Sequence, residues 1–309
     1  MLARVSVLEQ VPEVAQERIH ELAKTNKFSL TPYSMGSWSP SKYKSLDKCS
    51  LKFLLDYILK ISVIEPDEHT DDSALRHIGT AAHSILEFCI QGDSLDDAYE
   101  KAKVNHLKDV TETYWPNVEN LRYNIGEFLL RLQQFKARNQ VRKVYPELKL
   151  AVDKDWKPVP FFSPKAYFRG VVDLPMLLEN DDVIIIDHKH GGSPEFGLRN
   201  YQEQLDSYKA LFHFGQQKIE GAASGIHFIK EGDILLGRRV SKSYIEDVPS
   251  RIQVFIEGSI NQVNDLGKFN YSRNSLCSYC DYKEICHNGK RGTANKLQPV
   301  IELSGELLK

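Results

Sequence analysis

The sequence has no long apolar segment, no excess of either charge and few cysteines. Within its 309 residues, no apolar run approaches the roughly 20 residues that a membrane-spanning helix needs. The formal net charge of −2 gives no overall sign of nucleic-acid binding, although a basic groove can coexist with an acidic site in a neutral total. Five cysteines in a chain of this length argue against a disulfide scaffold.

The chain also lacks a secretory signal pattern and a helicase phosphate loop. Its first apolar stretch contains acids and no small-residue cleavage site, unlike a signal peptide. The pattern G-x-x-x-x-G-K-[ST] does not occur, so this chain is not expected to be the motor of a helicase-nuclease. With 41% hydrophobic and 27% charged residues, the composition is that of a globular protein. We expect it in the cytoplasm, or in the host cytoplasm if the chain is viral.

Hydrophobic periodicity divides the chain into a mostly helical first half and a strand-rich second half. Helical spacing is found in residues 1–30, after Cys49, from Leu75 to Cys89 and within 94–140. Apolar runs predict strands at 145–152, 166–178, 182–187, 222–229 and 233–240. Further helices are predicted at 196–213 and 245–266. This order predicts a mixed α/β core with a helical N-terminal addition.

Asp173, Asp187 and Lys189 form the first candidate site. Asp187 closes an apolar strand and Lys189 follows at i+2, a spacing that puts both side chains on one face. Asp173 lies on the preceding predicted strand, so strand pairing brings the carboxylates together. Close carboxylates repel one another unless a cation lies between them, and oxygen ligands suit Mg²⁺ or Mn²⁺. The alternative is a hairpin with polar ends and a surface Asp–Lys pair.

Four further residues can join that site. Glu147, on the strand predicted before the first aspartate, offers a third carboxylate or else a plain charge at a strand edge. His83 can act as an imidazole ligand, and Gly79 one turn before it leaves room for close approach, although lone helix histidines are more often structural. Gln204 and Tyr208 are i, i+4 on a predicted helix and point the same way. That face suits a phosphate backbone, with core packing of the tyrosine as the alternative.

Four cysteines form a split pattern, one near the start of the chain and a C-x2-C-x5-C group near its end: Cys49, Cys277, Cys280 and Cys286. If all four bind one cofactor, the remote segments must meet, and the cofactor acts as a structural staple. Four thiolates can hold zinc or a 4Fe–4S cluster. Zinc sites usually pair two C-x2-C knuckles, and here there is one; His287 offers a substitute zinc ligand. Cys89, within an apolar stripe, is expected to fill the core.

Taken in order, these motifs resemble the PD-(D/E)xK nuclease superfamily, and within it the branch of RecB-type and AddB-type nuclease domains and CRISPR-adaptation nucleases. The matching segments are SPSKYKSLDKCSLKFLLDYIL, GTAAHSILE, FRGVVDLPML, VIIIDHKHGG, QEQLDSYKALF and CSYCDYKEIC. They run from about residue 37 to 287 in the family's order. The resemblance implies a restriction-endonuclease-like α/β fold, with a mixed central sheet flanked by helices, a helical N-terminal region and a C-terminal cysteine cluster segment.

The resemblance also implies roles for single residues. The implied catalytic residues are Asp173, Asp187 and Lys189. The implied metal ligands are His83, Asp173, Asp187 and, by a looser correspondence, Glu147. The implied DNA contacts are Gln204 and Tyr208, from the Q-x-x-x-Y motif. The implied occupant of Cys49, Cys277, Cys280 and Cys286 is a 4Fe–4S cluster, with zinc as the alternative.

The chain departs from the family pattern around the D-x-K motif. His188 and His190 stand where the family often has tyrosine and threonine, and Val172 stands in place of the proline of the superfamily name. We expect the main-chain geometry and the activity to survive these changes. The polarity of the site is expected to differ.

Four regions are expected. They are an N-terminal helical extension (1–36), a helical region carrying Cys49 and His83 (37–143), the nuclease core (144–270), and the cysteine cluster segment with a tail (271–309).

The implied function is a Mg²⁺- or Mn²⁺-dependent deoxyribonuclease, an exonuclease acting at DNA ends or on single strands in recombination, repair, phage DNA processing or CRISPR adaptation. DNA is the implied partner, and a helicase, recombination or CRISPR-adaptation protein is the implied protein partner. No association with a membrane is implied. Two alternatives stay open. One is a non-catalytic subunit with a nuclease fold that binds DNA or serves assembly and is held together by an iron–sulfur or zinc site. Loss of a catalytic aspartate or of the lysine would indicate this alternative, and all of these residues are present. The other is a zinc-stapled interaction protein without a nucleic-acid role.

Overall fold

The computed structural model describes residues 31–32, 35–58, 71–108, 110, 112–191, 194–266, 274, 277 and 280. The chain divides into two compact units. The smaller combines Met1–Ile64 with Ser250–Lys309, and the larger is Glu65–Pro249. The helical pattern predicted for 1–30, together with Cys286 and His287, lies outside the described residues.

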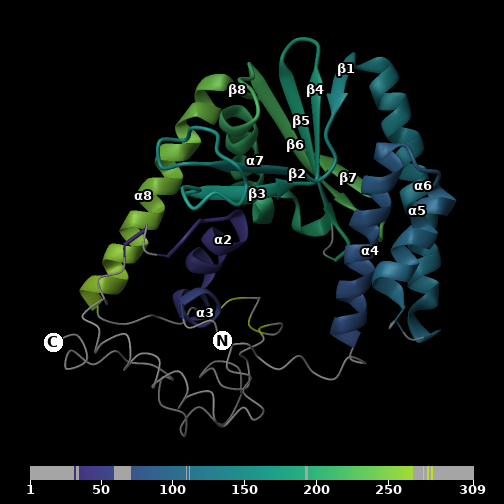
Figure 1. The fold of residues 1–309 in the computed structure, drawn as a ribbon, viewed down its shortest axis with the longest axis horizontal. Helices are drawn as coiled ribbons and strands as arrows, with labels where there is room; N and C mark the ends of the chain where they lie inside the picture. The colour runs from purple at the N-terminus through teal and green to yellow at the C-terminus, as the bar shows by residue number, and fades with distance from the viewer. Residues whose placement is uncertain are drawn as a thin grey trace, which may run out of the picture. The chain divides into compact units, whose positions relative to one another are not determined.

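A six-stranded sheet forms the centre of the larger unit (Figure 1). Its strands are β1 (Val141–Val144), β4 (Leu174–Leu178), β5 (Asp182–Lys189), β6 (Gly221–Phe228), β7 (Asp233–Leu236) and β8 (Val240–Ser241). The order is β1-β4-β5-β6-β7, with β8 beside β6. β5 and β6 are parallel and the other pairs of this sheet are antiparallel. A parallel pair needs a crossover, and the helix α7 (Gln202–Gly215) lies between these two strands in the chain.

Two of the predicted strands are wrong in their extent. The run 166–178 forms two strands, because the chain leaves one sheet for another at Asp173: β3 (Phe168–Val172) pairs with β2 (Leu148–Val152) in a separate two-stranded sheet, and β4 belongs to the main sheet. The run 145–152 becomes a strand only at Leu148. Glu147 lies in the preceding turn with φ 46°, so its predicted place on a strand is wrong.

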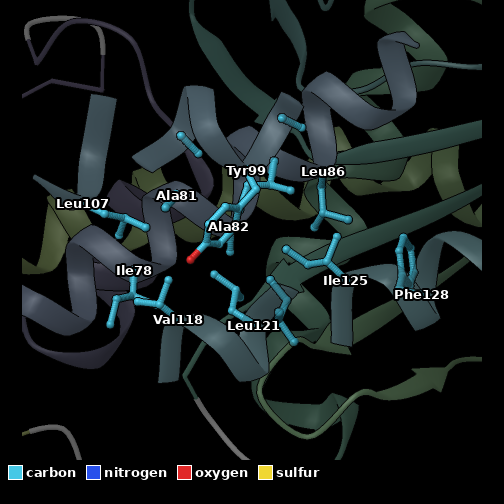
Figure 2. Packing of buried hydrophobic residues seen from close by; sticks show 14 of the residues in the cluster. Ile78, Ala81, Ala82, Leu86, Tyr99, Leu107, Val118, Leu121, Ile125 and Phe128 are labelled. Atoms are coloured by element: carbon cyan, nitrogen blue, oxygen red, sulfur yellow. The ribbon is translucent and has the colours of Figure 1, made fainter. Parts of the chain in front are cut away.

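Three helices pack against one face of the main sheet. They are α4 (Asp71–Gln91), α5 (Leu95–Ala102) and α6 (Trp115–Arg138). Their buried side chains include Ile78, Leu86 and Ile125, and they meet strand residues such as Met176 and Ile186 in one apolar cluster (Figure 2). As predicted, Cys89 packs against this cluster, and burial, followed by Asp93, raises the pKa of its thiol to about 11.

The long helix predicted over 94–140 is interrupted. A π-helical turn at Lys103–Leu107 and a 3-10 turn at Glu112–Tyr114 separate α5 from α6. Pro116 lies in the first turn of α6, where its missing N–H costs no helical hydrogen bond. The interruption lets the two helices fold back on one another within the same layer, as their shared apolar cluster shows.

Helix α7 packs against the opposite face of the sheet. Leu205 meets Ile226 and Phe228 of β6, and the helix end approaches β2, where a side chain at Gly215 would meet Leu150 at 3.6 Å. The helix predicted at 196–213 begins later than expected, since 3-10 turns at Pro194–Phe196 and Leu198–Tyr201 precede it. The sheet is thus covered by helices on both faces, as the predicted α/β class requires.

The smaller unit contains α2 (Pro40–Lys48), α3 (Ser50–Phe53) and a π-helical segment Leu54–Ile58. Ser39 caps α2, its hydroxyl accepting from the Lys42 N–H at 3.2 Å, as predicted. Trp38 and Phe53 stack with ring centroids 5.7 Å apart. The helix α8 (Lys242–Leu266) begins in the larger unit and continues in the smaller. Among the described residues, no helix is both long and apolar enough to cross a membrane.

Candidate active site

Asp173 lies at the point where the chain passes from β3 to β4. Its side chain is 9% exposed, and its Oδ2 accepts a hydrogen bond from the His188 backbone N–H at 2.7 Å. The Asp173 carbonyl accepts from the Glu147 N–H at 2.8 Å. The break between the two sheets is what directs this carboxylate to the edge where β5 ends, because the residue is held from both sides by main-chain groups.

His83 and Glu147 reach the same place from two other elements. The His83 Nδ1 of α4 lies 3.0 Å from Glu147 Oε1 and 3.7 Å from Asp173 Oδ2. One ligand atom of each of the three residues lies within 4.8 Å of the others. At Gly79, one turn before His83, a Cβ would lie 3.5 Å from the His190 Cβ, an ordinary contact distance, so α4 passes close to His190 without needing glycine there. The sequence predicted all three residues, although it placed Glu147 on the wrong kind of element.

Asp187 and Lys189 form a close ion pair on the neighbouring strand. Both lie on β5, and the Lys189 Nζ is 2.6 Å from Asp187 Oδ2. The other oxygen of Asp187 accepts from Gln204 Nε2 at 3.1 Å, and the same amide donates to the Tyr208 hydroxyl at 2.8 Å. The i+2 and i, i+4 spacings put each pair on one face of its element, and the packing of α7 on the sheet brings the two pairs together. The structure links Gln204 directly to the Asp–Lys pair, and the buried Tyr208 supports it.

Burial raises the pKa values of both aspartates. Asp173 is almost completely buried and lies near the Asp187 carboxylate, and these two effects raise its pKa to about 7. Burial likewise raises the pKa of Asp187, although Lys189 opposes the shift. Two carboxyl groups that resist ionisation so close together are typical of a site that a cation completes.

The pKa values of the two cationic groups, Lys189 and His83, are raised as well, because nearby carboxylates outweigh burial. Burial lowers the pKa of Lys189, but the neighbouring Asp187 and Asp173 carboxylates more than offset it and raise the pKa overall. For His83, burial also lowers the pKa, while the hydrogen bond to Glu147 and the charge of Asp173 produce a net rise. The site thus holds a protonated lysine beside its carboxylates at neutral pH.

Sequence reasoning missed a layer of aromatic and imidazole rings behind the site. The rings of His188 and His227 share a hydrogen bond of 2.9 Å between their Nδ1 atoms, and Phe128 stacks on His227 at 4.2 Å. The His188 ring lies 5.9 Å from that of His83, edge-on. Burial lowers the pKa of His188 well below the usual value and that of His227 to about 3. The site polarity at His188 is therefore that of a buried imidazole ring, which is neutral and paired with the ring of His227.

Tyr201 is a second residue whose position the sequence did not reveal. It is half-buried at the end of a 3-10 turn and packs against the cluster of Leu205, Ile226 and Phe228. Burial raises the pKa of its hydroxyl, and the charges of Lys189 and Asp187 also act on it. The phenol is therefore within electrostatic range of the Asp–Lys pair. The 3-10 turn between β5 and α7 brings it there.

Cys49, Cys277 and Cys280 belong to the smaller unit. The side chain of Asn274 donates to the Lys48 carbonyl at 3.0 Å, which joins the residue before Cys49 to the segment before Cys277. The Asn274 backbone N–H points to the Cys277 sulfur at 3.4 Å. The remote cysteine and the C-x2-C knuckle are therefore carried by segments in contact. The fourth cysteine, Cys286, lies outside the described residues.

The mixed sheet, with buried carboxylates and a lysine where β4 and β5 meet, defines the class of this protein as a restriction-endonuclease-like α/β fold. The family follows from the sequence, which matches the family model of the PD-(D/E)XK nuclease superfamily over residues 37–287. The chain belongs to that superfamily and is a nuclease by family. The match covers both the described site and the cysteine segments.

Comparison with solved structures finds distant likenesses. A protein from Eubacterium rectale called "Putative exonuclease" is 11% identical, with a TM-score of 0.48, and the alignment covers 80% of this chain and 86% of that one. The protein SSO0001 is 13% identical, with a TM-score of 0.38 and coverage of 90% and 96%. A search among curated proteins found no match. The family assignment therefore rests on the family model.

Proposed function

We propose that this protein is a metal-dependent deoxyribonuclease that hydrolyses phosphodiester bonds at DNA ends or in single strands. The observation that carries the proposal is the convergence of His83, Glu147 and Asp173 within 4.8 Å, beside the ion pair of Lys189 with the buried Asp187. These groups come from the helix α4, the turn before β2, the junction of β3 and β4, and the strand β5. A convergence of this kind serves a metal and a scissile phosphate better than it serves stability, because the two buried aspartates have raised pKa values.

The donor set fits Mg²⁺ or Mn²⁺, because it combines carboxylate oxygens with one imidazole. When bound, the ion would polarise the phosphate and lower the pKa of a water molecule. The residues that would hold it are His83, Glu147 and Asp173, with the Asp187 carboxylate as a further ligand. The His188 N–H keeps the Asp173 carboxylate oriented toward the site.

Lys189 is proposed to act on the phosphate and the attacking water. Its ammonium group, raised in pKa by the two aspartates, carries a full positive charge where negative charge develops during hydrolysis. Gln204 holds Asp187 in place through its amide, and its half-buried side chain borders the site where the DNA backbone would lie. Tyr208 is buried, so its proposed part is to position the Gln204 amide rather than to contact DNA itself.

A cleavage assay with end-labelled single- and double-stranded DNA and Mg²⁺ or Mn²⁺ tests the proposal. Lys189→Ala is expected to lower the rate on the order of 100-fold or more, as loss of one preorganised charged group does in other enzymes. Lys136→Ala, at an exposed position of α6, is the control and should cut like the parent. Equal cutting by Lys189→Ala and the parent would show that the site is wrongly assigned.

For the smaller unit, a 4Fe–4S cluster held by Cys49, Cys277, Cys280 and Cys286 is proposed, with zinc as the alternative occupant. The contact between Asn274 and Lys48 supports the approach of the first cysteine to the knuckle. Anaerobic purification followed by a visible spectrum and metal analysis distinguishes the two. A brown protein with about four irons per chain is expected, whereas a colourless zinc protein would exclude the cluster.

A further inference from the structure

The hairpin formed by β2, β3 and their connection, residues 148–172, extends from the site and takes no part in the proposed chemistry. We call it the β2–β3 arm (Figure 1). Both of its ends are at the site, because Glu147 directly precedes β2 and Asp173 directly follows β3. Whatever binds along the arm is therefore led toward the carboxylates.

The connection between the two strands is a built structure. Trp156 is buried, stacked on Phe168 at 5.6 Å and edge-on to Phe214 of α7 at 5.6 Å. The Asp153 carboxylate accepts from two backbone N–H groups at 2.9 Å each. Three prolines in the connection, at 158, 160 and 164, limit its freedom further. The arm thus presents its surface side chains without a large ordering cost on binding.

That surface combines an exposed aromatic ring with positive charge. Phe162 is 80% exposed, and its ring lies 5.1 Å from that of Phe161, over which the Arg169 guanidinium is placed at 5.4 Å. Between 149 and 169 there are five basic and two acidic residues, a net charge of +3 in a chain of −2. The exposed lysines of the arm are Lys149, Lys154, Lys157 and Lys165.

An exposed ring beside lysines on a stiff support has the chemistry of a single-strand binding surface. Base faces stack on aromatic rings while lysines neutralise the phosphates, and this recognition tolerates any sequence. Duplex DNA hides its base faces in the stack, so the ring can contribute little there. A protein partner of the same surface would need an acidic, apolar face, but DNA already has to reach the adjoining site.

We propose that the β2–β3 arm binds the single-stranded part of the DNA, with Phe162 stacked on a base and the arm lysines on the phosphates. The proposal rests on the proposed nuclease function and adds its substrate class.

Fluorescence anisotropy with a labelled single-stranded oligonucleotide in EDTA measures the binding without cleavage. Phe162→Ala is expected to weaken binding about tenfold, as the loss of one stacking contact does. Its control is Tyr123→Ala, which removes a ring of similar exposure (69%) from α6 and should bind like the parent. For a blunt duplex the two variants should be indistinguishable.

The arm lysines are tested by salt dependence. Changing Lys154, Lys157 and Lys165 together to Gln should reduce the slope of log affinity against log salt by about 2, since each phosphate contact on a single strand contributes about 0.7. The control changes Lys108, Lys136 and Arg138 to Gln, which removes the same charge elsewhere on the surface. An equal loss of slope in both triple variants would mean a non-specific charge effect and would overturn the proposal.

The outcomes separate this inference from the proposed function. If the parent cuts DNA but Phe162→Ala binds single strands as tightly as Tyr123→Ala, the arm serves something else, such as a protein partner, and only the inference fails. If the parent neither binds nor cuts DNA with either metal, both proposals fail together. A tenfold loss confined to single strands, with cutting intact in the parent, supports both.

Discussion

Replacing Asp173 by asparagine is expected to stabilise the metal-free protein while removing its response to metal. The pKa of Asp173 is about 7, against an ordinary value of 3.8, because of its burial and the nearby Asp187. The folded protein therefore retains a proton that the unfolded chain loses. Stability falls as pH rises from about 4 to about 7, and above that the full cost of the buried charge is present.

The size of the effect follows from the shift. At about 1.4 kcal/mol per pKa unit, ionisation of Asp173 costs the fold at most about 4 kcal/mol, of which about 2–3 kcal/mol accumulates between about pH 5 and about pH 8. Relaxation around the charge lowers these values. The asparagine of the variant would still accept the His188 hydrogen bond through its amide oxygen. Asp173→Asn should therefore melt roughly 5–10 °C above the parent at pH 8 and much closer to it at pH 5.

Thermal unfolding in EDTA at both pH values measures this, and Asp182→Asn is the matched control. Asp182 is also buried, but a two-point bond from Arg239, at 2.6 and 2.7 Å, lowers its pKa. Its stabilising effect is present above its ordinary pKa and lost only below it, so Asp182→Asn should destabilise equally at both pH values. Excess Mg²⁺ should stabilise the parent at pH 8 but not Asp173→Asn. If the gain in melting temperature of Asp173→Asn over the parent does not grow with pH, the pKa of Asp173 is not raised in the folded protein.

Three further predictions concern the metal, the cysteines and the core. The affinity of the parent for Mn²⁺ should rise nearly tenfold per pH unit below about pH 7 and level off above it, because Asp173 must lose its proton to bind; a flat titration calorimetry profile would contradict this. Cys49→Ser should lose visible absorbance and iron while the larger unit keeps its circular dichroism, and retention of full iron would remove Cys49 from the ligand set. Ile125→Ala should lower the free energy of unfolding by about 2–5 kcal/mol in urea, whereas a loss under 1 kcal/mol would contradict its full burial in the helical layer.

The chemistry of the site could be predicted from the sequence because it depends on short, regular spacings. Asp187 and Lys189 share a strand face by the period of two, and Gln204 and Tyr208 share a helix face by the i, i+4 rule. The continuous apolar run at residues 183–186 indicated the buried strand that carries Asp187 and Lys189. In the structure these two faces meet, with the amide of Gln204 on Asp187.

Other parts of the site depend on events without a periodic signal. The passage of the chain from one sheet to another at Asp173 has the same apolar pattern as a single long strand, so the sequence predicted one strand where there are two. The left-handed conformation of Glu147 is likewise invisible in a run that alternates. Both features lie at the base of the β2–β3 arm, where the Glu147 N–H donates to the Asp173 carbonyl.

By itself, the sequence determined which of the candidate site residues share a strand or helix face, since residue type and local spacing fix that. It also determined the family, through the order of its motifs. Only the tertiary structure decided that His83, Glu147 and Asp173 meet within ligand distance and that His188 and His227 form a neutral pair behind them. The reason is physical: contacts between remote elements depend on how helices and sheets pack, and local periodicity does not encode that packing.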